Sequence, residues 1–223
     1  MLLKPRSKKQ ASSTLSRKNS KNGKMLKKEA NVIVGGLSTP CKMPCYSINL
    51  PAAACITGQI MARVSGTTCH GCYAMKGRYR FKTTKKAMAR RLGALAHASW
   101  ITAMVTLMKG RPHFRWHDSG DLQGAQHLKN ILEVAGQTPD TQHWLPTRES
   151  KLLALMDPDI IPPNLIIRLS ATKVNGAASI SWPWTSTVST TTKTCPASDQ
   201  GGKCLDCRSC WSRDIKNVQY AKH

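Results

Sequence analysis

The chain has 223 residues, a hydrophobic content of 40% and 34 Lys and Arg against 11 Asp and Glu, which gives a formal net charge of +23. Length and apolar content suffice for a packed core, and they exclude a wholly disordered chain. The charge makes polyanions the expected partners. Polar side chains interrupt the longest apolar stretch, residues 92–108, so we expect no membrane span.

The first thirty residues form a strongly basic segment that contains one acidic residue, Glu29. This composition cannot bury a core, so we predict a flexible basic arm over residues 1–30. A single domain over residues 31–213 and a tail over residues 214–223 are expected to follow. Basic residues directly after the first three positions do not fit a secretory signal, and we expect a cytoplasmic location.

The cysteines fall into two groups. The later group contains Cys195, Cys204, Cys207 and Cys210, and the earlier group contains Cys41, Cys45, Cys55, Cys69 and Cys72. The Cys-x2-Cys spacings favour metal ligation over disulfides. Three ligands within seven residues are more typical of a 4Fe-4S iron-sulfur cluster than of zinc, although zinc remains an alternative. We therefore predict two metal centres, with His70 as a spare ligand and with the role of Cys41 or Cys45 left open.

Half of the positions between residues 76 and 91 are basic. Thr83 or Thr84 can cap a helix there, with an apolar stripe on one side. The basic residues Lys82, Lys86 and Arg90 recur at four-residue intervals on another face. A solvated helix face would explain this run, but the unbalanced charge of the whole chain favours binding of DNA or RNA through this helix and the arm.

From residue 111 the pattern alternates between strands and helices. Strands are predicted at residues 113–117, 143–145 and 165–169, with amphipathic helices at 126–135 and 149–157 between them. This spacing predicts parallel strands joined by helical crossovers. The expected class is therefore α/β, as a partial (open) βα barrel with irregular cysteine-rich metal-binding segments at both ends.

Polar residues follow each of the first two predicted strands, at the edge of the sheet where ligands bind. The candidate catalytic residues there are Asp118, Asp121, Arg148 and Glu149. Each has a structural alternative, because an aspartate can cap a helix, Glu149 can lie in the first turn of a helix and Arg148 can pair with a carboxylate. Gly120 would allow a backbone or a ligand to approach closely.

Six separated blocks carry a resemblance to a known family. They are residues 42–45, 50–55, 69–74, 114–121, 144–149 and 195–211. In this order they resemble the phage gene-product-eighty-eight family, over residues 33–213. The resemblance implies a phage or prophage origin, and hence the host cell cytoplasm as the place of action, and it leaves the reaction open.

A second, more distant resemblance is to radical S-adenosylmethionine enzymes and their phage relatives. Residues 69–73 are similar to the end of their cluster-binding loop, and residues 119–121 are similar to the turn that holds the amine of the cofactor. This implies a cluster on Cys69, Cys72 and an upstream cysteine, either Cys55 or Cys45. The residues implied to contact the cofactor are Ser119, Gly120, Asp121 and Arg148.

Two functions therefore agree with the sequence. The first is a radical S-adenosylmethionine-like enzyme that acts on a nucleic acid or another anionic substrate. The alternative is a non-catalytic nucleic-acid-binding protein, in which iron-sulfur clusters or zinc ions only stabilise the irregular segments.

Overall fold

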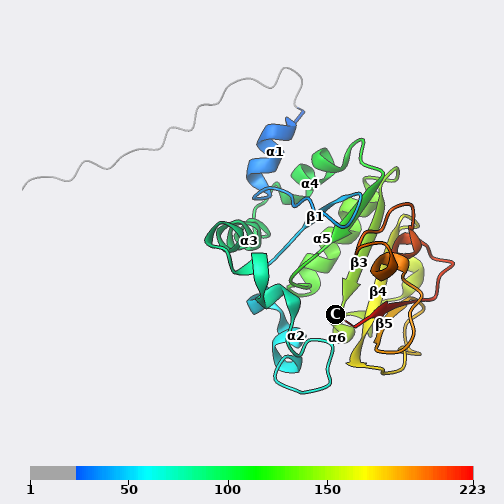
Figure 1. Cartoon of the computed structure of the whole chain (residues 1–223). Coiled ribbons are helices and arrows are strands. Elements are labelled where there is room, and N and C mark those ends of the chain that lie inside the picture. Colours follow the sequence, from blue (N-terminus) through cyan, green and yellow to red (C-terminus); the bar gives the residue numbers. More distant parts are fainter. Residues whose placement is uncertain (1–23, 223) are drawn as a thin grey trace, which may run out of the picture.

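The computed structural model describes residues 24–222 (Figure 1). Six strands form one sheet: β1 (Tyr46–Ile48), β2 (His113–Trp116), β3 (Gln142–Thr147), β4 (Leu165–Val174), β5 (Thr185–Ser189) and β6 (Asn217–Ala221). All neighbouring pairs are parallel, and the strand order is the chain order. β1 and β6 lie at opposite edges, so the sheet is open. The predicted α/β class and the parallel pairing of the three central strands are confirmed.

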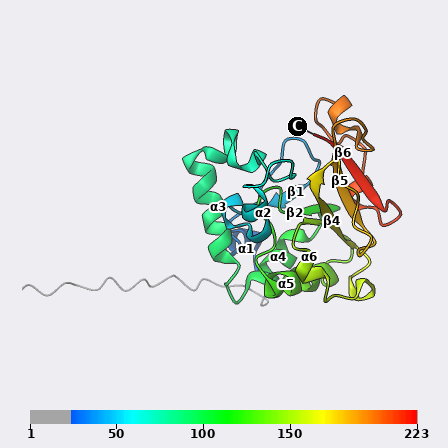
Figure 2. The same cartoon turned by 90° about the horizontal axis from the view of Figure 1, so that it is seen from below.

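Six α-helices accompany the sheet: α1 (Lys27–Ile33), α2 (Ile56–Met61), α3 (Lys82–Ala94), α4 (Trp100–Met108), α5 (Ala125–Gly136) and α6 (Ser150–Leu153). Helices α4, α5 and α6 lie together on one side of the sheet (Figure 2). The crossover helix α5 follows β2, as expected for parallel strands. The core is therefore a layer of helices packed on one sheet face.

The two faces of β2 differ in character. Phe114 and Trp116 are fully buried, and Trp116 packs against Trp100 of α4. The alternate position Arg115 points to the opposite face, which we call the inner face. The strand register places Trp144 of β3 on this same face, and Arg115 lies over its ring. The inner face thus carries a half-buried cation beside an aromatic side chain.

Two helix boundaries differ from those predicted. Residues 149–157 contain only the short helix α6, because the Asp157 carboxylate accepts a hydrogen bond from the Asp159 backbone and starts a separate turn at Pro158. Helix α3 begins at Lys82, so neither predicted threonine caps it, and no side chain bonds to its first turn. The basic helix itself is present as predicted.

Both ends of the predicted domain are also corrected. Residues 27–30 belong to α1, where Ala30 is fully buried, so the arm prediction is wrong for them. Residues 1–23 of the predicted arm lie outside the described residues. At the other end β6 pairs with β5, and the predicted tail is therefore part of the sheet. The sequence did not predict β1, β5 or β6.

Candidate functional site at the carboxyl ends of the strands

The cysteine-containing segment 50–72 begins against the turn that follows β2. The backbone NH of Leu50 donates to the Ser119 carbonyl, and the Ser119 hydroxyl donates to the Leu50 carbonyl. Gly120 has a φ of +81°, and a Cβ there would lie 2.6 Å from the Leu50 Cβ. Only glycine fits this approach. Ser119 and Gly120, which were predicted to contact a cofactor, thus hold the segment in place.

The same segment is next bound to the ends of β3 and β4. Thr57 donates its backbone NH (2.9 Å) and its hydroxyl (2.7 Å) to the two carboxylate oxygens of Glu149. Thr68 donates its backbone NH to the Thr172 carbonyl and its hydroxyl to the Ala171 carbonyl. The segment therefore crosses the ends of three successive strands, the edge where ligands collect in parallel sheets.

This crossing brings together three thiols from separate parts of the segment. A Cβ added at Gly58 would lie 3.6 Å from the Cys55 sulfur and 3.7 Å from the Cys69 sulfur. Burial and, to a lesser extent, nearby Asp121, Cys72 and Cys69 raise the pKa of Cys55 to about 12. Negative charge at these thiols is thus unfavourable unless a cation accompanies it.

Arg148 is the cationic side chain at these thiols. Burial raises the pKa of Cys69, and the guanidinium of Arg148 opposes this by its charge and by a hydrogen bond to the sulfur. One guanidinium nitrogen also donates to the Ala171 carbonyl at 2.7 Å. Arg148 is only half-buried, so its side chain lies between the thiols and solvent at the carboxyl ends of the strands, which we call the rim.

Asp121, the second carboxylate of this rim, is fully engaged. It accepts from the Thr147 hydroxyl (2.6 Å) and from the backbone NH groups of Leu122 (2.8 Å) and Arg148 (2.9 Å). Burial nevertheless raises its pKa to about 6, because desolvation outweighs these three donors. Asp121 joins the ends of β2 and β3, and its carboxylate acts first as a positioning group.

The first carboxylate, Asp118, points to the other side of the rim. It accepts from the Ser47 hydroxyl at 2.6 Å and from the Tyr79 hydroxyl at 3.1 Å. The Tyr73 hydroxyl, next to Cys72, donates to the Asp118 backbone carbonyl. Asp118 therefore ties the end of the cysteine segment to β1 and β2. His70, the predicted spare ligand, is exposed and lies 3.3 Å from the Ala62 carbonyl through its ring Nδ1.

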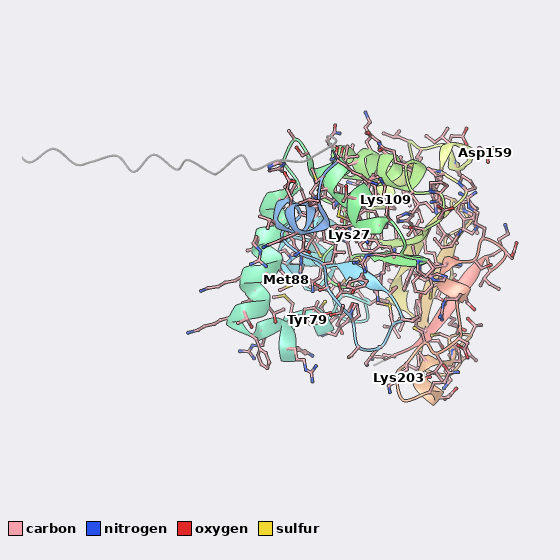
Figure 3. The ribbon with its side chains drawn as sticks, turned by 90° about the horizontal axis from the view of Figure 1, so that it is seen from above. Lys27, Tyr79, Met88, Lys109, Asp159 and Lys203 are labelled. Carbon is pink, nitrogen blue, oxygen red and sulfur yellow. The ribbon has the colours of Figure 1, made fainter. Side chains whose placement is uncertain are left out.

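The C-terminal cysteine segment packs on the inner face of the sheet. Arg168 of β4 is fully buried, and its five donors reach five backbone carbonyls. These belong to Thr185, Ser209, Cys210, Ser212 and Ile215. Figure 3 shows Lys203 of this segment at the opposite end of the molecule from Asp159. A single guanidinium thus holds most of the turn around Cys210.

The C-terminal thiols lie close enough together to affect one another's pKa values. Burial raises the pKa of Cys204, and Cys195 and Cys207 raise it further. Burial raises the pKa of Cys210 to about 11, although its bond to the Tyr220 hydroxyl and the nearby Arg115 oppose this. All nine cysteines of the chain are free thiols. Across residues 24–222, no three His, Cys, Asp or Glu side chains are arranged to hold a single metal ion.

The sequence analysis missed two arginines of the inner face, the half-buried Arg115 and the fully buried Arg168. Arg115 lies within electrostatic reach of Tyr73 and Asp118 on one side and of Cys210 on the other. Its Nε is buried without a partner among the described residues. A charged residue at one alternate position of an otherwise apolar strand was the available signal, because such a side chain is rarely buried without a role.

The basic face of α3 is exposed as predicted. Lys82, Lys86 and Arg90 all lie on the surface, and Arg90 also donates to the Gly35 carbonyl at 3.2 Å. In the part of the chain that the structure describes, one ion pair is present, between Lys193 and Asp199. The charges on this face of α3 are therefore not neutralised by carboxylates of the same chain.

Fold and site together define an α/β protein whose open parallel sheet carries one cysteine-rich segment across its strand ends and a second on its inner face. The chain belongs to the family described as Gene product 88, whose model matches residues 11–213, and it is accordingly a phage protein. No curated protein and no solved structure matches it. Between residues 24 and 222, no helix has the length and apolar character needed to cross a bilayer.

Proposed function

We propose that this protein is a phage-encoded iron-sulfur enzyme of the radical S-adenosylmethionine type, which acts on a nucleic acid or another anionic substrate in the host cytoplasm. One observation carries the proposal: Cys55 and Cys69 meet at the carboxyl ends of a sequentially ordered parallel sheet, with Cys72 and Arg148 beside them. This edge is where parallel βα folds place their chemistry.

The donor set fits a 4Fe-4S cluster. Three soft thiols lie together, and the raised pKa values of Cys55 and Cys69 mean that a cation is needed to keep these two ionised. A cluster distributes its thiolates over several irons and therefore holds them farther apart than a single ion does. Three thiolates on four irons leave one iron open for a cofactor. When bound there, reduced cluster and S-adenosylmethionine would supply one-electron cleavage chemistry.

The rim residues then divide into two roles. Arg148 is the candidate that can contact an anionic group, because its guanidinium lies at the thiols and is half-exposed. Asp118, Asp121 and Glu149 are positioning residues, since their carboxylates already accept hydrogen bonds from the chain. Glu149 holds the residue two positions after Cys55, and so fixes the start of the thiol-bearing segment on the rim.

The test is cofactor cleavage by protein that was loaded with iron and sulfide without oxygen and then reduced. We expect 5′-deoxyadenosine from S-adenosylmethionine, a loss of at least tenfold in Cys72→Ser, and no loss in Cys41→Ser, because Cys41 is exposed. Arg148→Met is expected to retain iron but weaken binding of the cofactor in calorimetry. If cluster-loaded protein neither binds nor cleaves S-adenosylmethionine, the enzymatic proposal fails.

A second candidate function, nucleic-acid binding without chemistry, is supported by the exposed cations of α3. Lys82, Lys86 and Arg90 form a row that lacks carboxylate partners among the described residues. Such a row attracts phosphates, and binding releases counterions from the nucleic acid. Both centres would then serve only to stabilise the cysteine-rich segments.

Replacing these three residues with glutamine is expected to weaken binding to DNA or RNA at least tenfold at low salt. The slope of log affinity against log salt should fall by up to about 3, because each lost phosphate contact removes nearly one unit. Fluorescence anisotropy over a salt series measures both quantities. A control with the same charge change, at the exposed Lys129, Lys151 and Lys216, should bind nearly as the unaltered protein does. Equal losses in both variants would show that only the net charge matters.

A further inference from the structure

We propose that Cys45 is a ligand of the C-terminal metal centre, together with cysteines of the 195–210 segment, and not a ligand of the N-terminal centre. By its position in the sequence, Cys45 falls among the N-terminal cysteines, and its role as a ligand was left open. The inference rests on the proposed presence of metal, but it requires neither a particular metal nor any reaction.

The first argument is a hydrogen bond just before Cys45. The backbone NH of Cys204 donates to the Lys42 carbonyl at 2.9 Å. Close to it, a Cβ at Gly202 would lie 3.2 Å from the Lys42 side-chain nitrogen. The loop that leads to Cys45 and the turn that carries Cys204 are therefore in direct contact, although 162 positions separate the bonded residues in the sequence.

The second argument is a contact just after Cys45. Tyr46, the first residue of β1, pairs in register with Phe114 of β2. The Phe114 carbonyl accepts from the Trp211 indole at 3.1 Å, and Trp211 directly follows Cys210. Cys45 thus lies in the chain between Lys42, which is bonded to Cys204, and Tyr46. The strand partner of Tyr46, Phe114, is bonded to Trp211.

The thiol environment agrees with this placement. Burial raises the pKa of Cys45 to about 11, Arg115 lowers it, and Cys204 is the neighbouring thiol that raises it. In the N-terminal group, the thiols that affect the pKa of Cys55 are Cys69 and Cys72, and the thiol that affects the pKa of Cys69 is Cys72. Cys41, at the start of the same loop, is exposed. Together with the hydrogen bond between Cys204 and Lys42, this places Cys45 near the C-terminal group.

Two consequences follow from this assignment. If Cys45 takes one of at most four thiolate positions, one of the four cysteines of the 195–210 segment is not a ligand of this centre. The N-terminal centre retains only Cys55, Cys69 and Cys72, which leaves one position unfilled by cysteine. The metal would also connect the loop before β1 to the C-terminal segment, at opposite ends of the chain.

The experiment isolates each centre in the full-length chain. Replacing Cys55, Cys69 and Cys72 with serine leaves only the C-terminal centre, and into this background we introduce either Cys45→Ser or the matched control Cys41→Ser. After anaerobic loading with iron and sulfide, or with zinc alone, we expect Cys45→Ser to lose at least half of the bound metal and Cys41→Ser to lose none. Full metal retention in Cys45→Ser would overturn the assignment.

The reciprocal background carries serine at Cys195, Cys204, Cys207 and Cys210. There Cys45→Ser should leave metal content unchanged, and a loss would instead place Cys45 in the N-terminal centre.

A second measurement does not depend on replacing Cys45, and so it is not affected by misfolding of the Cys45 variants. The reactivity of Cys45 toward an alkylating agent is measured by mass spectrometry. In the first background the metal should protect Cys45 until a chelator is added, whereas Cys41 should react throughout, and rapid reaction of Cys45 in metal-loaded protein would also overturn the proposal. Absence of metal from every form would refute the proposed function as well, whereas metal retained without Cys45 refutes this inference alone.

Discussion

Replacing Arg168 with methionine is expected to cost about 3–5 kcal/mol of folding free energy, the range for removing one partner from a buried charged network. Methionine keeps much of the apolar stem but donates nothing. The partly buried carbonyls of Ser209, Cys210, Ser212 and Ile215 would lose their donor, along with the buried carbonyl of Thr185 in β5. Each unsatisfied carbonyl adds its own desolvation penalty. The C-terminal cysteine segment should consequently detach from the inner face of the sheet.

Chemical denaturation measures the loss in stability, and limited proteolysis between residues 190 and 216 measures the detachment. The matched control is Arg208→Met in the same segment, because the Arg208 guanidinium donates to the nearby carbonyls of Leu205 and Cys207. This control should cost less than about 1 kcal/mol. Equal protease resistance in Arg168→Met and the unaltered protein would show that other contacts hold the segment.

Acidification from pH 7 to pH 4 is expected to destabilise the fold by at least about 3 kcal/mol through buried histidines. Burial lowers the pKa of His127 to about 4 and that of His143 to about 3, from an ordinary value of 6.5. Burial and the neighbouring His127 also lower the pKa of His117. Below pH 6.5 the unfolded chain binds protons that the folded chain excludes, so stability falls as the pH falls.

The carboxylate of Asp121 acts in the opposite direction. Its pKa is raised to about 6, so the folded chain binds this proton before the unfolded chain does, which offsets about 2 kcal/mol of the loss by pH 4. Denaturation midpoints measured from pH 4 to pH 7 test the balance. His127→Gln should flatten the profile, whereas His97→Gln, at an exposed position, should leave it unchanged. Identical profiles for all three proteins would contradict a role for His127.

The sequence predicted the part of the fold in which strands and helices alternate. Strands β2, β3 and β4 are separated by amphipathic helical segments, and hydrophobic periodicity is the strongest signal in a single sequence. β1 has only three residues, and β5 consists mainly of Ser and Thr, so neither carries a comparable pattern. The placement of polar residues at the strand ends followed from parallel pairing, and the structure brings Asp121 and Arg148 together there.

The partners of these polar residues could not be predicted. Whether Glu149 binds Thr57 or a ligand depends on where helix α2, which carries Thr57 92 positions away, crosses the carboxyl ends of the strands. Cys45 shows the same limit, because its place in the sequence groups it with the N-terminal cysteines while the loop before it contacts the turn that carries Cys204. Local spacing identifies candidate ligands, and long-range packing decides which of them share a centre.

The crossing of segment 50–72 over three strand ends also orders events during synthesis. Cys55 and Cys69 leave the ribosome long before the residues that position them, since Thr57 needs Glu149 and Thr68 needs Thr172. Domains emerge from their amino-terminal end, and contacts between distant residues form slowly. Translation must therefore reach β4 before the first thiol group can assemble, and the second group waits for the final forty residues. A nascent chain stalled in mid-synthesis would therefore expose thiols that the finished fold packs together.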